Sequence, residues 1–298
     1  MKQLIKTLVI LAAGRGSRFG GAKQFHQFGV LNKTLMEYNI CHAIYHGFTK
    51  IIFITQEAHQ AQLTQQVITH LPKHVDCHIV YQQSDNLPKE CFIDASRTKP
   101  LGTAHALWCA RNKLNESFVV INADDYYGEH AFKLAAQHHE KETFAIVAYQ
   151  LKQTLSKNGG VNRAICQVST NKQLLMLTEF ENIKRIDNGD VIGKATQTTA
   201  QKIDDNCLVS MNFWCLNKDV FPLLKQLLIN TFSSEKDNNK ECYLPSIVNI
   251  TKDAPSQITR VLASHAPWFG VTYATDSANV TNQLTELTHK GFFHPLQK

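Results

Sequence analysis

The strongest constraint on the fold lies near the N-terminus, where an apolar run passes directly into a glycine-rich loop. The run Leu-Val-Ile-Leu-Ala-Ala occupies residues 8–13, and the ten residues from Gly14 to Lys23 hold four glycines together with Arg15, Arg18 and Lys23. Glycines let successive peptide N–H groups turn toward an anion without interference from a Cβ atom, and the cations add charge that such a nest lacks. The segment therefore predicts a buried first strand whose carboxyl end carries a cradle for a nucleoside triphosphate.

The first half of the chain alternates between strand-like and helix-like segments. We predict strands over residues 4–12, 50–55, 77–81, 117–122 and 144–150. We predict helices from Thr34, which has capping-box spacing to Glu37, to Gly47, then over 57–71, from near Gly102, and over 129–139. Such alternation predicts an α/β fold with a parallel sheet and crossover helices. Ligands of these sheets bind outside the carboxyl ends of the strands, where the glycine loop and Asp124 both fall.

The second half is expected to build a lobe over that crevice. A polar, flexible join at 151–160 leads to predicted strands at 161–168, 174–179 and 208–216, with a polar segment before the last of them. Predicted helices cover 219–231, 243–250 and 276–290, short strands cover 258–263 and 268–273, and 233–240 is a charged loop. We expect one domain over 1–298, with a nucleotide-binding half at 1–150 and a second half at 151–298.

Composition excludes several classes of protein. The formal charge of +6 comes from 31 basic and 25 acidic residues, which is too mild and dispersed to indicate a nucleic-acid partner. No apolar run is long enough to cross a membrane, so we expect no membrane partner. The eight cysteines form no C-x-x-C pair, which favours reduced thiols and a cytoplasmic location. The sequence leaves open whether the protein forms a homo-oligomer.

Two other phosphate-binding patterns fit the glycine loop less well. In a dinucleotide fingerprint the third glycine would come one residue earlier than Gly20, and only Glu57 after the second strand supports that pattern. A P-loop requires a Gly-Lys-Ser/Thr sequence, and none follows here. With Arg18 and Lys23 included, the segment resembles the signature L-A-A/G-G-x-G-[S/T]-R with a following K-[P/Q]. That signature belongs to the sugar-1-phosphate nucleotidyltransferases, also called NDP-sugar pyrophosphorylases.

This resemblance implies a Rossmann-like α/β fold with a mixed, mostly parallel sheet of the nucleotide-diphospho-sugar transferase type. It also implies a set of nucleotide contacts. The loop would wrap the triphosphate, while Arg18 and Lys23 would neutralise the departing pyrophosphate. The implied nucleotide-binding residues are Leu11, Ala12, Ala13, Gly14, Gly16, Ser17 and Arg18, with Gln82, Gly102 and Thr103 reading the base; His105 is interpreted as an ordinary helix residue.

An acidic motif after the fourth predicted strand resembles the family's metal site. Within Ile-Asn-Ala-Asp-Asp, Asp124 would hold Mg²⁺, whereas Asp125 is either a second ligand or a helix cap. The family usually supplies another carboxylate late in the chain, and Gly270 stands at that position here. Asp276 is the nearest candidate to replace it, although it is equally well placed to cap the last helix.

The resemblance also implies an acceptor site in the second half. Gly160, Arg163, Glu179 and Asn212 would bind a sugar-1-phosphate. Phe180 stands where the family often has a lysine for the sugar phosphate, so Arg163, Lys184 or Arg185 would have to supply that charge. The implied reaction joins a nucleoside triphosphate to a sugar-1-phosphate and releases pyrophosphate. Two alternatives stay open, namely transfer to phosphocholine or another non-sugar phosphate, and a non-catalytic nucleotide-sugar sensor.

Overall fold

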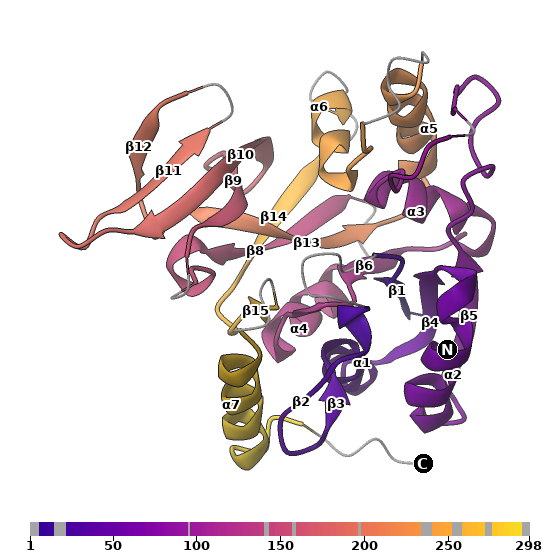
Figure 1. Cartoon of the computed structure of the whole chain (residues 1–298), viewed down its shortest axis with the longest axis horizontal. Coiled ribbons are helices and arrows are strands. Elements are labelled where there is room, and N and C mark those ends of the chain that lie inside the picture. The colour runs from indigo at the N-terminus through magenta and orange to yellow at the C-terminus, as the bar shows by residue number, and fades with distance from the viewer. Residues whose placement is uncertain are drawn as a thin grey trace.

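A central sheet with helices on both faces forms the body of the protein (Figure 1). The computed structural model describes residues 6–14, 22–94, 96–139, 143–156, 159–195, 198–233, 240–251, 258–271 and 276–293. Strands from both halves of the chain share this one sheet, because β13 (Leu208–Leu216) pairs with both β6 (Phe118–Asn122) and β8 (Phe144–Gln150).

The central strands run almost entirely in one direction. Their order is β5 (Asp76–Tyr81), β4 (Phe48–Thr55), β1 (Lys6–Leu11), β6, β13, β8 and β14 (Thr259–Ser264). The β5–β4, β4–β1, β1–β6 and β8–β14 pairs are parallel, whereas β13 is antiparallel to both of its neighbours. The prediction of an α/β fold with a mixed, mostly parallel sheet is therefore confirmed.

The sheet forks at β13. Val209 and Ser210 pair with β9 (Val161–Val168), whereas Trp214 to Leu216 pair with β6. Between these two pairings the register shifts, and Asn212 has a positive φ of 61°. The branch that begins at β9 continues through β10 (Leu174–Arg185), β11 (Val191–Ala195) and β12 (Ala200–Ile203), all antiparallel, and projects from the body in Figure 1. The fork brings the carboxyl end of β6 close to the start of β9.

Helices cover the two faces of the central sheet. α1 (Leu35–Tyr45), α2 (Gln60–Gln66) and α4 (Glu129–His138) pack on one face, and α3 (Thr103–Cys109), α5 (Val220–Thr231) and α6 (Ile247–Thr251) pack on the other. β1 contributes to both cores, because Leu8 and Ile10 face the first set while Val9 and Leu11 face the second. Within the described part of the chain, no helix has the length and apolar character needed to cross a membrane.

A smaller third core ties the C-terminal helix to the body. α7 (Asp276–His289) places Val280 and Leu284 against Phe28 and Tyr38. Two short ladders complete this region, namely β2 (Gln27–Phe28) with β3 (Lys33–Thr34), and β7 (Asp125–Tyr126) with β15 (Phe269–Gly270). The second ladder brings the segment after β6 against a segment near the C-terminus.

Most predicted elements are present, with differences of one or two residues at their ends. Two differ by more: β10 extends six residues beyond Glu179, where we predicted its end, and the helix predicted over 243–250 is a 3₁₀ turn at Leu244–Ser246 followed by α6. The single helix predicted over 57–71 is wrong, because 3₁₀ turns flank α2 and Val67 (φ −121°, ψ −60°) leaves helical angles. The polar segment before residue 208 forms β11 and β12, whose few buried side chains hide the alternation of a strand. The join at 151–160 begins with a 3₁₀ turn at Leu151–Gln153, and Leu151 and Thr154 are buried. Residues 234–239 and 272–273 of the predicted loop and strand lie outside the described residues.

The start of α1 carries the predicted capping box. The Thr34 hydroxyl accepts from the Glu37 N–H at 3.2 Å, and the Glu37 carboxylate accepts from the Thr34 N–H at 2.8 Å. We expect Thr34→Ala to lower the free energy of unfolding by about 1 kcal/mol, because one N–H of the first turn loses its partner. Urea denaturation measures this loss, and Thr69→Ala, at an exposed threonine, should cost clearly less. Equal costs for the two variants would show that the cap does not stabilise α1.

Candidate functional site

Three predicted site residues of the first half, together with Gln56, line one edge of the central sheet. Gln82 follows β5, Gln56 follows β4, Ala12 follows β1 and Asp124 follows β6. These four strands are adjacent and parallel, so their carboxyl ends meet at the same edge in the order β5, β4, β1, β6. Neighbouring strands lie about 4.8 Å apart, so the edge from Gln82 to Asp124 extends over roughly 14 Å.

Two glutamines hold the start of the glycine loop. The Gln24 amide donates to the carbonyls of Ala12 at 3.3 Å and Gly14 at 3.2 Å, and the Gln56 amide donates to the carbonyl of Ala13 at 3.0 Å. In a trans peptide the carbonyl and the following N–H point in opposite directions. The N–H groups of Ala13 and Gly14 therefore point away from the glutamines that hold the preceding carbonyls.

The roles of these two glutamines were missed by sequence reasoning. Gln24 is the second residue of the K-[P/Q] signature, which could have drawn attention to it, whereas nothing in the sequence singles out Gln56. The predicted contacts Gly16, Ser17 and Arg18 lie outside the described residues.

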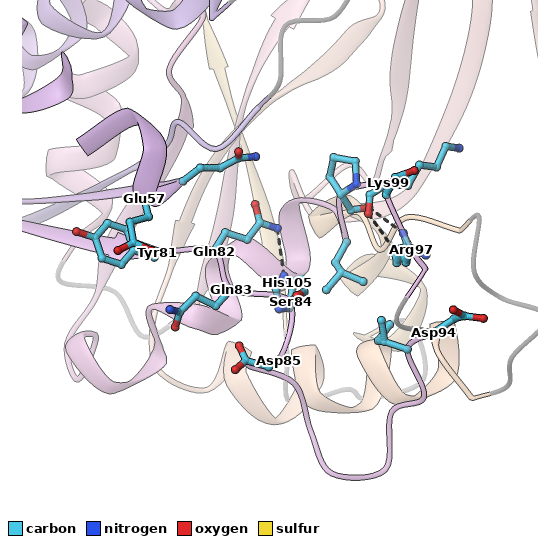
Figure 2. Close-up of a pocket in the computed structure, with 15 residues that line it drawn as sticks. Glu57, Tyr81, Gln82, Gln83, Ser84, Asp85, Asp94, Arg97, Lys99 and His105 are labelled. Atoms are coloured by element: carbon cyan, nitrogen blue, oxygen red, sulfur yellow. Dashed lines mark hydrogen bonds between the residues drawn. The ribbon is translucent and has the colours of Figure 1, made fainter. Parts of the chain in front are cut away.

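A cavity of about 730 Å³ opens beside this loop, in the size range of small-molecule sites. Figure 2 shows side chains around it that come from the ends of β4 and β5 and from the following excursion. It is lined by Gln56, Glu57, Tyr81, Gln82, Gln83, Ser84, Asp85, Ile93, Asp94, Arg97, Thr98, Lys99, Pro100, Leu101 and His105. The described part of the 82–100 segment thus forms a wall of the cavity.

Arg97 secures that wall. Its guanidinium donates to the carbonyls of Lys99 at 2.9 Å, Pro100 at 2.8 Å and Lys240 at 2.5 Å. It also lies 5.4 Å from the ring centre of Phe232, which follows α5. One side chain therefore joins the long segment after β5 to two segments from the second half of the chain.

Gly102 begins α3 in a conformation that suits glycine. Its φ is 96°, and a Cβ atom there would overlap the backbone of Cys242. The close approach of Cys242 therefore accounts for the glycine at this position, and a contact of Gly102 with a base stays a prediction. The Thr103 hydroxyl accepts from the Leu244 N–H at 2.9 Å, which anchors the next residue to the same segment.

His105 is a fully buried neutral histidine below Gln82. Burial lowers its pKa to about 4. Its Nδ1 lies 3.1 Å from the Gln82 amide nitrogen, and its Nε2 lies 3.1 Å from the Asn86 carbonyl oxygen. A neutral imidazole that supports a neighbouring side chain fits the expectation that His105 is neither an acid nor a base.

The acidic motif after β6 meets the end of the glycine loop. Lys23 forms an ion pair with Asp124, and its ammonium also donates to the Val271 carbonyl at 3.3 Å. Both charged side chains are about a quarter exposed, 27% for Lys23 and 26% for Asp124, so a ligand can reach them. The predicted phosphate-binding lysine and the predicted metal ligand are therefore in direct contact.

Asp125 is held by a directional chain of hydrogen bonds (Trp214 to Asn212, Asn122 and Asp125). The Trp214 indole N–H donates to Asn212 Oδ1 at 2.9 Å, Asn212 Nδ2 donates to Asn122 Oδ1 at 2.7 Å, and Asn122 Nδ2 donates to Asp125 Oδ2 at 2.8 Å. Because an indole can only donate, it fixes the orientation of both amides. Both ends of the Asn212 amide are thus engaged by protein groups, so this side chain supports the carboxylate; its contact with a sugar stays a prediction.

The Asp125 carboxylate occupies the space above Gly270. These two residues are paired in the β7–β15 ladder, and a Cβ atom on Gly270 would overlap Asp125 Oδ1. α4 has Gly128 at its N-cap without a side-chain cap, so the described structure gives Asp125 no capping role there. Burial and the neighbouring Asp124 raise the pKa of Asp125 to about 7.

Adjacent carboxylates of this kind suit a hard cation such as Mg²⁺, because they offer oxygen ligands from one strand end. Asp124 is partly open and Asp125 is oriented beside it, so the residues present fit such an ion. In the described chain no group of three or more His, Cys, Asp or Glu side chains is arranged around a metal position. Asp276 is the first residue of α7, as a helix N-terminal acid would be, and its metal role stays a prediction.

Arg163, on β9, is a partly buried cation whose charge acts on Asp125. Arg163 pairs with Phe180 across β9 and β10, so the two side chains lie on the same face of the sheet. Phe180 stands where the family often has a lysine. The Arg163 guanidinium donates to Thr154 O at 2.6 Å and Oγ1 at 3.2 Å, and lies 4.8 Å from the Trp268 ring centre. Burial lowers its pKa to about 10, and the charges of Asp125 and Glu179 oppose that shift.

The other predicted acceptor residues lie on the same branch of the sheet. Glu179 is exposed on β10, where partial desolvation raises its pKa and the charge of Arg163 lowers it. Gly160 directly precedes β9, and a Cβ atom there would overlap the side chain of Asn182. These positions place the predicted acceptor residues beyond Asp124 along the site, on the far side of the fork.

Comparison with known proteins shows the family of this chain. Residues 7–168, more than half of the chain, match the family model described as nucleotidyl transferase. The chain belongs to the nucleotidyl transferase family. No curated protein is detectably similar in sequence. The matched residues include the glycine loop, the residues that line the cavity, the acidic pair and β9.

Solved structures share the fold over nearly the whole chain. An inositol-1-phosphate CTP transferase from T. maritima has a TM-score of 0.64 at 17% identity and covers 96% of both chains. A protein from Bacillus anthracis described as a candidate glucose-1-phosphate thymidylyltransferase, in complex with a sucrose, has a TM-score of 0.62 at 14% identity and covers 94% of this chain and 95% of its own. A UDP-glucose pyrophosphorylase from Acinetobacter baumannii has a TM-score of 0.58 at 15% identity, with coverage of 96% and 99%.

The buried His105 predicts a defined pH dependence of stability. Its pKa is lowered in the folded state, so between about pH 6.5 and pH 4 the unfolded chain binds a proton that the folded chain does not. The contribution of His105 to the free energy of unfolding is therefore fully present at neutral pH and is lost as the pH falls toward 4. The loss is roughly 3 kcal/mol at most. Urea denaturation from pH 7 to pH 4 should show a smaller loss for His105→Gln than for the unmodified protein. Parallel curves for the two would refute this account.

The overlap at Gly270 predicts coupling to Asp125. We expect Gly270→Ala to lower the free energy of unfolding by roughly 1–3 kcal/mol, because the new methyl group displaces the carboxylate. In an Asp125→Ala background the same change should cost less, with a coupling energy of about 0.5–3 kcal/mol in a double-mutant cycle measured by urea denaturation. Additive effects would show that the two residues do not compete for this space.

Proposed function

We propose that this nucleotidyl transferase joins a nucleoside triphosphate to a sugar-1-phosphate, producing an NDP-sugar and pyrophosphate. The observation that carries the proposal is the order of groups along one edge of the sheet. A cavity at β4 and β5 is followed by the glycine loop at β1, the Lys23–Asp124 pair at β6 and the Arg163 branch beyond the fork. That order suits a base, a triphosphate, the reacting phosphorus and an acceptor phosphate laid end to end.

The residues divide the work of transfer between positioning and charge. The acceptor phosphate oxygen attacks the α phosphorus in line with the departing pyrophosphate, without a covalent enzyme intermediate, so catalysis depends on orientation and electrostatics. Lys23 stabilises negative charge on the leaving group, and Arg163 holds the acceptor phosphate. Three of the five Arg163 N–H groups are engaged by Thr154 and Asn162, which orients the guanidinium.

Asp124 and Asp125 are the residues that would hold Mg²⁺. When bound, Mg²⁺ would supply charge neutralisation between the α phosphate and an anionic nucleophile. The Trp214–Asn212–Asn122 chain orients Asp125 for this role, and Lys23 balances the charge of Asp124. Asp276 is retained as a further candidate ligand from the C-terminal segment.

The names of the structural neighbours support an acceptor that carries a phosphate and several hydroxyl groups. Two neighbours are named for glucose-1-phosphate or UDP-glucose and one for inositol-1-phosphate. Glu179, an exposed carboxylate on β10, can accept hydrogen bonds from such hydroxyls. Phosphocholine, the non-sugar alternative, carries no sugar hydroxyl that could donate to this carboxylate.

A substrate panel tests the proposal directly. We expect pyrophosphate release only with a matched pair of nucleoside triphosphate and sugar-1-phosphate, in the presence of Mg²⁺. Lys23→Ala should reduce this rate by on the order of 10²–10³ because stabilisation of the leaving group is lost. The matched control is Lys290→Ala, which removes an exposed lysine paired with Glu286 near the C-terminus and should retain full activity.

The same panel separates the alternatives. Pyrophosphate release with phosphocholine, but with none of the sugar phosphates, would show that the acceptor is a non-sugar phosphate. Thermal stabilisation by triphosphates without release from any pair would indicate a sensor. Full activity of Lys23→Ala in a folded protein would contradict the assigned role of the glycine loop.

A further inference from the structure

A buried asparagine on α1 bonds to the main chain of the acidic motif. Asn39 is fully buried inside α1, outside the glycine loop, the capping box and the acidic motif itself. Its Nδ2 donates to the Asp125 carbonyl at 2.6 Å, and its Oδ1 accepts from the Tyr127 N–H at 3.0 Å. Asparagine is a poor helix former, and a buried amide is costly unless both of its ends are bonded. These two bonds therefore account for an asparagine at this position.

The two bonds reproduce the contacts that a neighbouring parallel strand would make. In a parallel ladder, one residue bonds the carbonyl of the residue before its partner and the N–H of the residue after it. Asn39 bonds the corresponding groups before and after Tyr126, the second residue of β7. β7 also pairs with β15, through Phe269 and Gly270. This short strand is thus held by a true strand and by a side chain that takes the place of one.

The orientation of the Asn39 amide is fixed, because a carbonyl can only accept and a peptide N–H can only donate. Turning the amide over would place its oxygen against the Asp125 carbonyl oxygen and its nitrogen against the Tyr127 N–H. A second residue of α1 holds the side chain between them, since His42 Nε2 lies 2.9 Å from the Tyr126 hydroxyl. Side chains of α1 therefore hold three consecutive residues, 125–127.

We propose that Asn39 is a positioning residue for the metal site: by holding the main chain of Asp125, it fixes where the Asp125 carboxylate can reach. Asn122 orients that carboxylate from the side-chain end, by a bond of 2.8 Å, and Asn39 holds the main-chain end. The inference rests on the proposed function in one respect, that Asp124 and Asp125 hold Mg²⁺.

Mg²⁺ is the ion most sensitive to such placement. It demands a nearly ideal octahedron of oxygens at about 2.0–2.1 Å, whereas Ca²⁺ accepts irregular sets of oxygens at about 2.3–2.6 Å. Loosening the main chain at Asp125 should therefore weaken Mg²⁺ binding more than Ca²⁺ binding. A general loss of stability would weaken the binding of both ions alike. The ratio of the two affinities thus separates a positioning role from a merely structural one.

Competition with Mn²⁺ measures this ratio without the transfer reaction. The full-length protein is titrated with Mn²⁺ alone, free Mn²⁺ is followed by its paramagnetic resonance signal, and Mg²⁺ or Ca²⁺ is then added as a competitor. For Asn39→Ala we expect the dissociation constant of Mg²⁺ to rise by roughly tenfold to a hundredfold, as is typical when a residue that orients a metal ligand is removed. The dissociation constant of Ca²⁺ should rise clearly less.

The matched control is Thr34→Ala, which removes the cap of the same helix and leaves both Asn39 bonds in place. It should leave both metal dissociation constants unchanged. Asp125→Ala should weaken Mn²⁺ binding at least as much as Asn39→Ala does, which ties the signal to the acidic pair. If Asn39→Ala fails to fold, Asn39→Ser decides the question, because its shorter side chain cannot bond both peptide groups.

The outcomes separate the positioning role from the proposed reaction. An unchanged Mg²⁺ constant in a folded Asn39 variant, or equal losses for Mg²⁺ and Ca²⁺, would overturn the inference while leaving the proposed reaction in place. The expected change in the ratio, with no pyrophosphate release from any substrate pair, would support the inference and overturn the proposed reaction. No Mn²⁺ binding, or binding that Asp125→Ala leaves unchanged, would overturn both the inference and the metal site on which it rests.

Discussion

The fork of the sheet at β13 is the constraint on which the rest of the site depends. One strand pairs with β9 along its first residues and with β6 along its last ones, and the change of partner requires the irregular backbone at Asn212. The same residue sends its amide to Asn122, at the carboxyl end of β6. The feature that divides the sheet into two branches therefore also orients the acidic motif between them. The proposed transfer would need a nucleotide and an acceptor held in fixed relation, and this strand joins the two branches of the sheet to which we assign them.

Two chains of hydrogen bonds give the site its polarity. Each begins at a group whose role cannot change, the Trp214 indole that only donates and the Asn86 carbonyl that only accepts. The first passes through the amides of Asn212 and Asn122 to Asp125, and the second passes through the His105 ring to Gln82. A site built in this way arrives pre-organised, because no amide has to turn over when a ligand binds. The result is that protein groups fix the orientation of both the Gln82 amide and the Asp125 carboxylate.

Much of the fold could be predicted from the sequence because its signals are local. The apolar run at 8–13, the Thr34–Glu37 box and the alternation of elements each depend on residues close together in the chain, and each was confirmed. The errors came where tertiary pairing decides local structure. β11 and β12 form because β10 extends to Arg185 and offers them an edge, although few of their side chains are buried. The partners of Gln56 and Asn212 lie 43 and 90 residues away, beyond the reach of any local pattern.

What the sequence by itself determined was the class of chemistry, because a glycine loop with Arg18 and Lys23, followed by carboxylates at a strand end, is a local arrangement of donors and charges. Only the tertiary structure decided how the opposite wall is built. Gly270 and Phe180 look like losses in the sequence, but Asp125 fills the space above Gly270 and Arg163 lies across from Phe180. Charge acts through space, so a carboxylate or a cation can be supplied from a neighbouring strand. Which strand supplies it is settled by register and packing, which a linear sequence does not display.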